Sequence, residues 1–250
     1  SAMSSNLVTP REDYNYLSRL TRDPQVRAVQ TGGDTITRKR QPMNGNPIMR
    51  AARIHELGSP DAITVDLIER PSPSANEVLV AVEAAAVNFP DTLMIAGHYQ
   101  TDTPLPFVPG HECAGIVVAV GTGVTEFAPG DRVAALAPGA FAEYVSVSES
   151  SAVPIPETVT FAEAAATWVC HLTAYHALRS TAKVKPGDVV LILGAGGGLG
   201  LAAVELAAGL EGTVIAAASN NDKLDAARDR GAAHLVDYAA GDLREGVRAA

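Results

Sequence analysis

The sequence predicts an α/β protein in which a mostly-β, barrel-like part precedes a doubly wound part of alternating strands and helices. Two observations support this fold class. Between residues 49 and 148, short β-type runs are separated by Pro and Gly, which is typical of small antiparallel barrels. After residue 188, an apolar run, a glycine-rich turn and an Ala/Leu-rich helical pattern follow one another, which is typical of a β-α-β unit.

Six apolar and β-branched runs predict the strands of the first part. Turn-forming clusters such as Pro71-Ser72-Pro73 and Pro129-Gly130-Asp131 separate them. An Ala-rich helical pattern follows from Phe161 to Leu178, and we place the boundary between the two parts within it. The predicted strands are Arg50–His55, Ala62–Arg70, Glu77–Val87, Gly115–Val120, Arg132–Ala135 and Ala142–Val147.

The second part opens with the apolar strand Val189–Leu193, which runs into a glycine-rich turn. Glycines let the backbone turn sharply and approach a ligand closely, and the N-terminus of the following helix attracts anions. The turn therefore predicts a dinucleotide pyrophosphate site; the alternative is a turn that only connects two elements. The cofactor-binding residues predicted here are Ala195, Gly197, Gly198, Leu199 and Gly200, with Ala195 in the first place of the G-x-G-x-x-G pattern.

The remaining elements of this part are the helix Leu201–Leu210, the strand Thr213–Ala218, the helix Asp222–Arg230 and the strand His234–Val236. Their spacing is that of a Rossmann fold.

The end of the second strand of this fold indicates which dinucleotide is bound. Sites that prefer NADH place Asp or Glu there to bind the ribose 2′-hydroxyl. Here Ala218 is followed by Ser219, Asn220 and Lys223, which suit a 2′-phosphate by hydrogen bonding and charge. We therefore expect NADPH, although the neighbouring Asp222 counts against it and Lys223 could be an ordinary surface residue.

Composition excludes several classes of function. The formal net charge of −9 argues against a nucleic-acid partner, because phosphate binding needs a positive field. No apolar run approaches the length that crosses a bilayer, and the start of the chain lacks the apolar core of a signal peptide, so we expect no membrane and a cytoplasmic location. Cys113 and Cys170 are the only cysteines, which excludes a disulfide framework and a four-Cys zinc lobe.

Residues 1–48 differ from the rest, being polar and weakly periodic. We expect a flexible extension there, with a short helix around Arg11 to Leu20. We interpret its basic cluster, Arg38-Lys39-Arg40, as part of a solvated tail; the alternative is a targeting signal or a nucleic-acid-binding patch.

From residue 49 onward the chain resembles the medium-chain dehydrogenase/reductase superfamily, and most closely its zinc-independent quinone oxidoreductases. The resemblance implies a GroES-like catalytic domain over residues 49–172 and the first half of a Rossmann NADPH-binding domain over residues 173–250. It also implies a homodimer. The segments that carry the resemblance are Val87–Asp91, Gly97–Tyr99, Pro106–Glu112, Gly115–Val117, Pro129–Val133, Gly139–Val145 and Leu172–Tyr175.

The zinc alcohol dehydrogenases of the superfamily bind a catalytic zinc through three side chains. This chain has Asn88 where they have the first thiolate, although His111 matches the second ligand and Cys170 lies near the third. With one thiolate missing we expect no metal. His111 would then cap a turn, and Cys170 would pack as a small hydrophobic residue.

The resemblance implies hydride transfer from NADPH to a quinone or related enone without a metal. By match to family positions, Asn88 and Tyr99 line the acceptor cleft as hydrogen-bond donors, Thr173 lies near the nicotinamide, and Tyr238 contacts the adenosine-phosphate end of NADPH. Asp91 orients its neighbours. His98 could supply a proton, or could simply be a solvated loop residue.

Only three strands of a six-stranded Rossmann sheet are found, so strand 1 would be an exposed apolar edge. We therefore expect the 250 residues to be a segment of a longer protein; as a complete chain they would catalyse weakly or associate through that edge. Other functions remain open. They are an alkenal or enoyl reductase on the same scaffold, an NADPH-binding sensor or interaction protein without turnover, and a zinc alcohol dehydrogenase.

Overall fold

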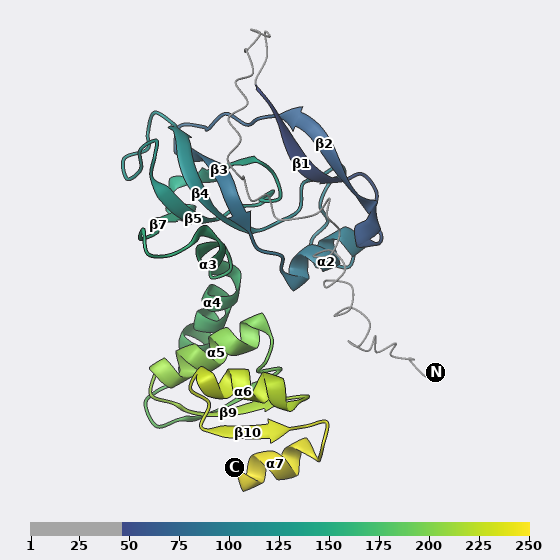
Figure 1. Ribbon diagram of the computed structural model, residues 1–250, viewed down its shortest axis with the longest axis vertical. Helices are drawn as coiled ribbons and strands as arrows, with labels where there is room; N and C mark the ends of the chain where they lie inside the picture. Colours follow the sequence, from purple (N-terminus) through teal and green to yellow (C-terminus); the bar gives the residue numbers. More distant parts are fainter. Residues whose placement is uncertain (1–46) are drawn as a thin grey trace. The chain divides into compact units, whose positions relative to one another are not determined.

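The computed structural model of the chain describes residues 47–250. The predicted helix around Arg11 to Leu20 and the basic cluster Arg38-Lys39-Arg40 lie outside the described residues. The described residues form a mostly-β part followed by an α/β part, which confirms the predicted fold class (Figure 1).

The mostly-β part is built on a five-stranded antiparallel sheet in the order β6-β3-β4-β5-β7. A second, two-stranded sheet, β1-β2, pairs through Ala51 with Ala142, which lies two residues before β6. The bounds are β1 Ile48–Ile54, β2 Ile63–Glu69, β3 Glu77–Ala85, β4 Glu112–Val120, β5 Arg132–Leu136, β6 Tyr144–Ser148 and β7 Ala152–Pro154, with α2 at Phe89–Ala96 and two 3₁₀ turns, Pro60–Ala62 and Glu149–Ser151.

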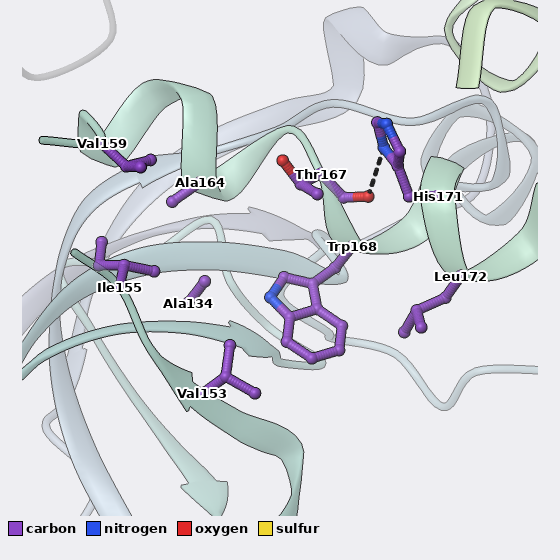
Figure 2. A pocket seen from close by; sticks show the side chains of 9 residues that line it. All are labelled: Ala134, Val153, Ile155, Val159, Ala164, Thr167, Trp168, His171 and Leu172. Carbon is purple, nitrogen blue, oxygen red and sulfur yellow. Dashed lines mark hydrogen bonds between the residues drawn. The ribbon is translucent and has the colours of Figure 1, made fainter. Parts of the chain in front are cut away.

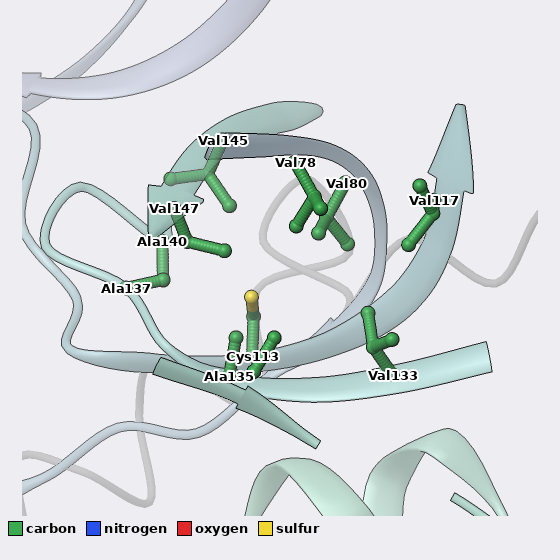
Figure 3. Close-up of a cluster of buried hydrophobic side chains, with 11 residues drawn as sticks. Val78, Val80, Cys113, Val117, Val133, Ala135, Ala137, Ala140, Val145 and Val147 are labelled. Atoms are coloured by element: carbon green, nitrogen blue, oxygen red, sulfur yellow. The ribbon is translucent and has the colours of Figure 1, made fainter. Parts of the chain in front are cut away.

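The large sheet curls around a core of valines and alanines, which Figure 3 shows on the concave side. Val78 and Val80 of β3, and Val145 and Val147 of β6, lie two residues apart and share this face, as the two-residue period of a strand requires. All six predicted strands are present. The main difference is at β4, which begins at Glu112 rather than at Gly115.

Two helices connect the parts where the sequence predicted one helical pattern. Helix α3, Phe161–Ala165, is followed by α4, Trp168–Tyr175, and by the π-helical turn His176–Thr181. The backbone N–H of Val169 donates to the carboxylate of Glu112, where a continuous helix would donate to the preceding turn. The Thr167 hydroxyl likewise donates to the carbonyl of Glu163. The buried carboxylate of Glu112 therefore accepts a hydrogen bond from the first turn of α4, where a new helix begins.

The α/β part contains the parallel sheet β10-β9-β8, in which successive strands are neighbours. Val204 and Ala207 of α5 pack on Val214 and Ala216 of β9 in its main core. This arrangement confirms the predicted strand–turn–helix–strand unit. The bounds are β8 Val189–Leu193, α5 Gly198–Gly209, β9 Thr213–Ala218, α6 Asn221–Asp229, β10 His234–Asp237 and α7 Leu243–Ala249.

Strand β8 is an open edge of this sheet within residues 47–250. Its alternate residues Val189, Leu191 and Leu193 are 67%, 40% and 60% exposed. No helix in this same range is both long enough and apolar enough to cross a membrane.

Two glycines of α5, Gly200 and Gly209, should respond differently to substitution by alanine. A Cβ added to Gly200 would lie 2.2 Å from the carbonyl oxygen of Gly194, whereas a Cβ added to Gly209 would meet no atom within 4 Å. We expect Gly200→Ala to destabilise the protein by roughly 1–3 kcal/mol through this overlap. Gly209→Ala should be neutral or slightly stabilising. Urea unfolding followed by circular dichroism measures both, and equal midpoints for the two variants would contradict the packing described here.

Candidate functional site

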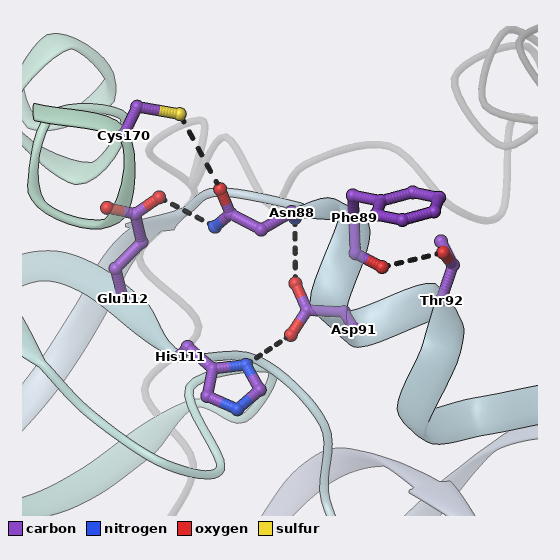
Figure 4. A network of polar contacts seen from close by, with 7 residues as sticks. All are labelled: Asn88, Phe89, Asp91, Thr92, His111, Glu112 and Cys170. Atoms are coloured by element: carbon purple, nitrogen blue, oxygen red, sulfur yellow. Dashed lines mark hydrogen bonds and ion pairs between the residues drawn. The ribbon is translucent and has the colours of Figure 1, made fainter. Parts of the chain in front are cut away.

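The predicted acceptor residue Asn88 lies at the N-terminus of α2. Asn88 is the N-cap residue of this helix, and Oδ2 of Asp91, three residues later, accepts from its backbone N–H at 2.7 Å. The Asn88 side chain turns toward β4 and α4 (Figure 4). This local arrangement presents the amide of Asn88 to neighbouring elements.

Glu112, the first residue of β4, receives that amide. Its Oε1 accepts from Asn88 Nδ2 at 2.7 Å and its Oε2 accepts from the backbone N–H of Val169 at 2.8 Å. The Glu112 side chain is only 1% exposed. The sequence analysis did not select Glu112 as a site residue, although it lies in the Pro106–Glu112 segment that carries the family resemblance.

Cys170 of α4 lies on the other side of the Asn88 amide. Its thiol points at Asn88 Oδ1, with 4.0 Å between sulfur and oxygen. The same sulfur would lie 3.2 Å from a Cβ added to Gly198, the first residue of α5. Burial, and secondarily the charge of Glu112, raises the pKa of the Cys170 thiol. Cys170 is thus a protonated thiol that lies close both to Asn88 and to Gly198 at the start of α5.

His111 pairs with the second buried carboxylate. Its Nδ1 lies 2.5 Å from Oδ1 of Asp91, which is 1% exposed, while the His111 side chain is 29% exposed. The hydrogen bond to Asp91 raises the pKa of His111, and burial opposes this shift. Asp91 therefore contacts both Asn88 and His111. Within residues 47–250, no three His, Cys, Asp or Glu side chains lie together as a metal site.

The other two predicted catalytic residues are not hydrogen-bonded to this network in the described part of the chain. Tyr99 follows α2 and is half-buried. Thr173 is exposed on α4, three residues after Cys170 and thus on the same side of the helix. Both stay predictions as site residues.

The glycine-rich turn fits a phosphate group on structural grounds. Gly194 has φ +65°, and Gly200 allows the contact between the turn and the start of α5 described above. Ala195 is fully buried and donates its N–H to Ala217 of β9 at 3.0 Å, which fixes the turn to the sheet. Gly197 is the N-cap, and the first N–H groups of α5, from Gly198 to Gly200, have no partner within the helix.

The residues predicted to select NADPH lie beside this turn. Lys223 Nζ donates to Ser219 Oγ at 3.3 Å, and a Cβ at Gly196 would lie 2.4 Å from Lys223 Cβ. Asn220 caps α6 by accepting from the backbone N–H of Lys223 at 3.0 Å. The sequence analysis had missed Gly196, whose missing side chain makes room for Lys223. Tyr238, 41% exposed, follows β10 and donates its N–H to Ala218.

An apolar hollow of about 320 Å³ lies elsewhere, between α3, α4 and strands β5 and β7 (Figure 2). It contains neither Asn88 nor the glycine-rich turn and is therefore not part of the candidate site. Its lining residues are Ala134, Val153, Ile155, Val159, Ala164, Thr167, Trp168, His171 and Leu172.

Comparison with known proteins shows what this chain is similar to. Residues 74–157 match the family model of the alcohol dehydrogenase GroES-like domain. The chain is 37% identical over 166 residues to the quinone oxidoreductase of Rattus norvegicus, covering 65% of this chain and 50% of the relative. The chain thus contains a GroES-like domain of the alcohol dehydrogenase type and is a homologue of quinone oxidoreductases.

Two solved structures are also similar. A mycobacterial protein complexed with NADPH is 37% identical, with a TM-score of 0.71, covering 76% of this chain and 58% of that one. The CurK enoyl reductase is 31% identical, with a TM-score of 0.70, covering 76% and 59%. The chain spans about half the length of the curated quinone oxidoreductases that it matches.

The Asp91–His111 pair predicts a specific titration. Because Asp91 raises the pKa of His111, Asp91→Asn should move that pKa down. In the unchanged protein, protonated His111 stabilises the fold below its unfolded pKa of about 6.5, and this contribution is lost as the pH rises through the raised folded value. The stability difference between the two proteins should thus be larger at pH 5.5 than at pH 8.5.

NMR titration of the histidine rings measures the shift directly, and the other histidines of the chain serve as internal controls. An unmoved His111 pKa in Asp91→Asn would contradict the pairing.

Proposed function

We propose that this chain is part of an NADPH-dependent oxidoreductase that transfers hydride to a quinone or related enone without a metal ion. The observation that carries the proposal is the position of Cys170, whose sulfur contacts Asn88 and also approaches Gly198 at the start of α5. The predicted acceptor residue and the predicted pyrophosphate turn therefore lie on either side of one side chain.

The residues of the turn would hold the cofactor. The N–H groups at the start of α5 would bind the pyrophosphate, and Ser219, Asn220 and Lys223 would bind the 2′-phosphate, with Tyr238 against the adenosine end. NADPH, when bound, supplies the hydride. The complex of the mycobacterial relative with NADPH supports this choice of cofactor.

On the acceptor side, hydride addition leaves negative charge on a carbonyl oxygen, which hydrogen-bond donors stabilise. Asn88 Nδ2 carries two N–H groups and uses one for Glu112, so the second is the donor that we assign to the acceptor oxygen. Tyr99 would supply a second donor, and Thr173 would lie beside the nicotinamide. We assign no metal ion to this site, because Asn88 stands in the place of the thiolate that a catalytic zinc needs.

An enoyl or alkenal reductase is the second candidate, and the similarity to the CurK enoyl reductase favours it. Both reactions begin with hydride addition to an activated alkene or quinone. Steady-state kinetics with a quinone and with an α,β-unsaturated carbonyl compound as competing acceptors distinguish the two.

The cellular setting and assembly are part of the same proposal. We infer a homodimer in the cytoplasm, and the two unpaired thiols, Cys113 and Cys170, are compatible with a reducing compartment. The domain division into residues 1–48, 49–172 and 173–250 also stays a prediction, and the family match at residues 74–157 falls inside the second range.

The first test is a fluorescence titration of the chain with NADPH and NADH, followed by NADPH oxidation with a quinone present. Tight NADPH binding together with quinone-dependent oxidation is the expected result. Binding without turnover on any acceptor would favour the sensor alternative, and binding of neither nucleotide would overturn the proposal.

Lys223 predicts the cofactor preference. A hydrogen bond to a charged phosphate contributes about 1.5–3 kcal/mol, so Lys223→Ala should weaken NADPH binding about 10- to 100-fold and leave NADH binding nearly unchanged. Lys185→Ala, at an exposed position in the turn before β8, is the matched control. Equal losses for both nucleotides would show that Lys223 does not read the 2′-phosphate.

A further inference from the structure

Glu112 is a buried carboxylate to which the proposed reaction assigns no role. Its two oxygens have separate partners: Oε1 accepts from the side chain of Asn88 and Oε2 accepts from the backbone of Val169 (Figure 4). A carboxylate that is 1% exposed depends on such donors, because burying an unpaired charge costs several kcal/mol. Each of the two hydrogen bonds is thus strongly favoured.

These two donors belong to different elements of the site. Asn88 lies at the start of α2, and Val169 lies in the first turn of α4, the helix that also carries Cys170 and Thr173. One side chain of β4 therefore joins the acceptor residue to the helix that contacts the glycine-rich turn.

The carboxylate also decides which way the Asn88 amide faces. A carboxylate only accepts hydrogen bonds, so it selects the Nδ2 end of the amide. The Oδ1 end must then face the thiol of Cys170, which is a donor because its raised pKa keeps it protonated. The opposite orientation would set Oδ1 against a carboxylate oxygen.

We propose that Glu112 is the positioning residue of the candidate site: its two oxygens fix the amide of Asn88 in one orientation and hold the first turn of α4 at a set distance from it. The functional part of this inference rests on the proposed function, because it concerns how Asn88 meets the acceptor. The structural part is independent of any turnover.

Glu112→Gln is the decisive variant, because the introduced glutamine has one acceptor and one donor where the carboxylate has two acceptors. If its oxygen keeps the bond from Val169, its NH₂ group faces Asn88, and the Asn88 amide must rotate by half a turn to offer Oδ1. We expect this rotation, which moves the Asn88 NH₂ group beside Cys170.

NMR of the 250-residue chain reads this change without cofactor or substrate. In Glu112→Gln, the Asn88 side-chain amide resonances should shift, and their cross-relaxation contacts should move to the Cys170 side chain. Glu83→Gln, at an exposed carboxylate of β3, is the matched control and should leave both signals unchanged. Unchanged Asn88 resonances and unchanged Val169 amide protection in Glu112→Gln would overturn the proposal.

A double variant keeps the proposal testable if Glu112→Gln does not fold. Combining it with Asn88→Asp restores a donor–acceptor match at the contacts of position 88 with position 112 and with Cys170. The glutamine NH₂ group and the Cys170 thiol can both donate to the new carboxylate. The double variant should be folded where Glu112→Gln is not, and where both fold it should unfold at a higher urea concentration than Glu112→Gln alone. An equal or lower midpoint would show that the two residues do not act as a pair.

Measurements of enzyme activity separate this inference from the proposed function. If the chain oxidises NADPH with a quinone, Glu112→Gln should lower kcat about 100-fold with little change in KM, as expected for a misplaced acceptor group. A parallel loss in Glu83→Gln would contradict a specific role. If the unchanged chain has no turnover, the proposed function fails, while the NMR measurement still decides the role of Glu112.

Discussion

Two buried carboxylates that each need hydrogen-bond donors are the constraint on which the site depends. Asp91 satisfies its requirement with the N-terminus of α2 and with His111, and Glu112 satisfies its own with Asn88 and α4. Charge that is removed from water must be compensated locally, and here the compensation comes from four donor groups on three segments of the chain: Asn88 twice, His111 and Val169. The side chain of Asn88 is consequently held by a carboxylate of β4, and its backbone by a carboxylate of α2.

In the α/β part, the close contacts near the site depend on glycines, which have no side chain. Gly200 lets the turn contact the start of α5, Gly196 makes room for the stem of Lys223, and Gly198 leaves space for the sulfur of Cys170. These positions restrict the chain by excluded volume, since a single Cβ would displace a backbone atom or a neighbouring side chain. Electrostatics organises one side of the candidate site and close packing organises the other.

The sequence predicted the elements well wherever one pattern was sufficient. The strand Thr213–Ala218 has the predicted bounds, because an apolar run between a turn and a helix cap has a single interpretation. The start of β4 was missed because Glu112 breaks an apolar run, although its charge is satisfied by residues 24 and 57 positions away. The break between α3 and α4 was missed for the same reason, since its cause is the distant Glu112 carboxylate. Local sequence patterns were therefore sufficient to predict the glycine-rich turn. They could not predict polar contacts between residues that are far apart in the sequence.

The order of strands in the α/β part has a consequence for how the chain acquires its structure. Val189 of β8 pairs with Thr213 of β9, only 24 positions later, whereas Glu77 of β3 pairs with Ser148 of β6, 71 positions later. Closing the shorter loop costs less chain entropy, and folding rates rise as contacts become more local. Pairing β8 with β9 thus closes a shorter loop than pairing β3 with β6, and the β-α-β unit can assemble without waiting for that longer-range contact.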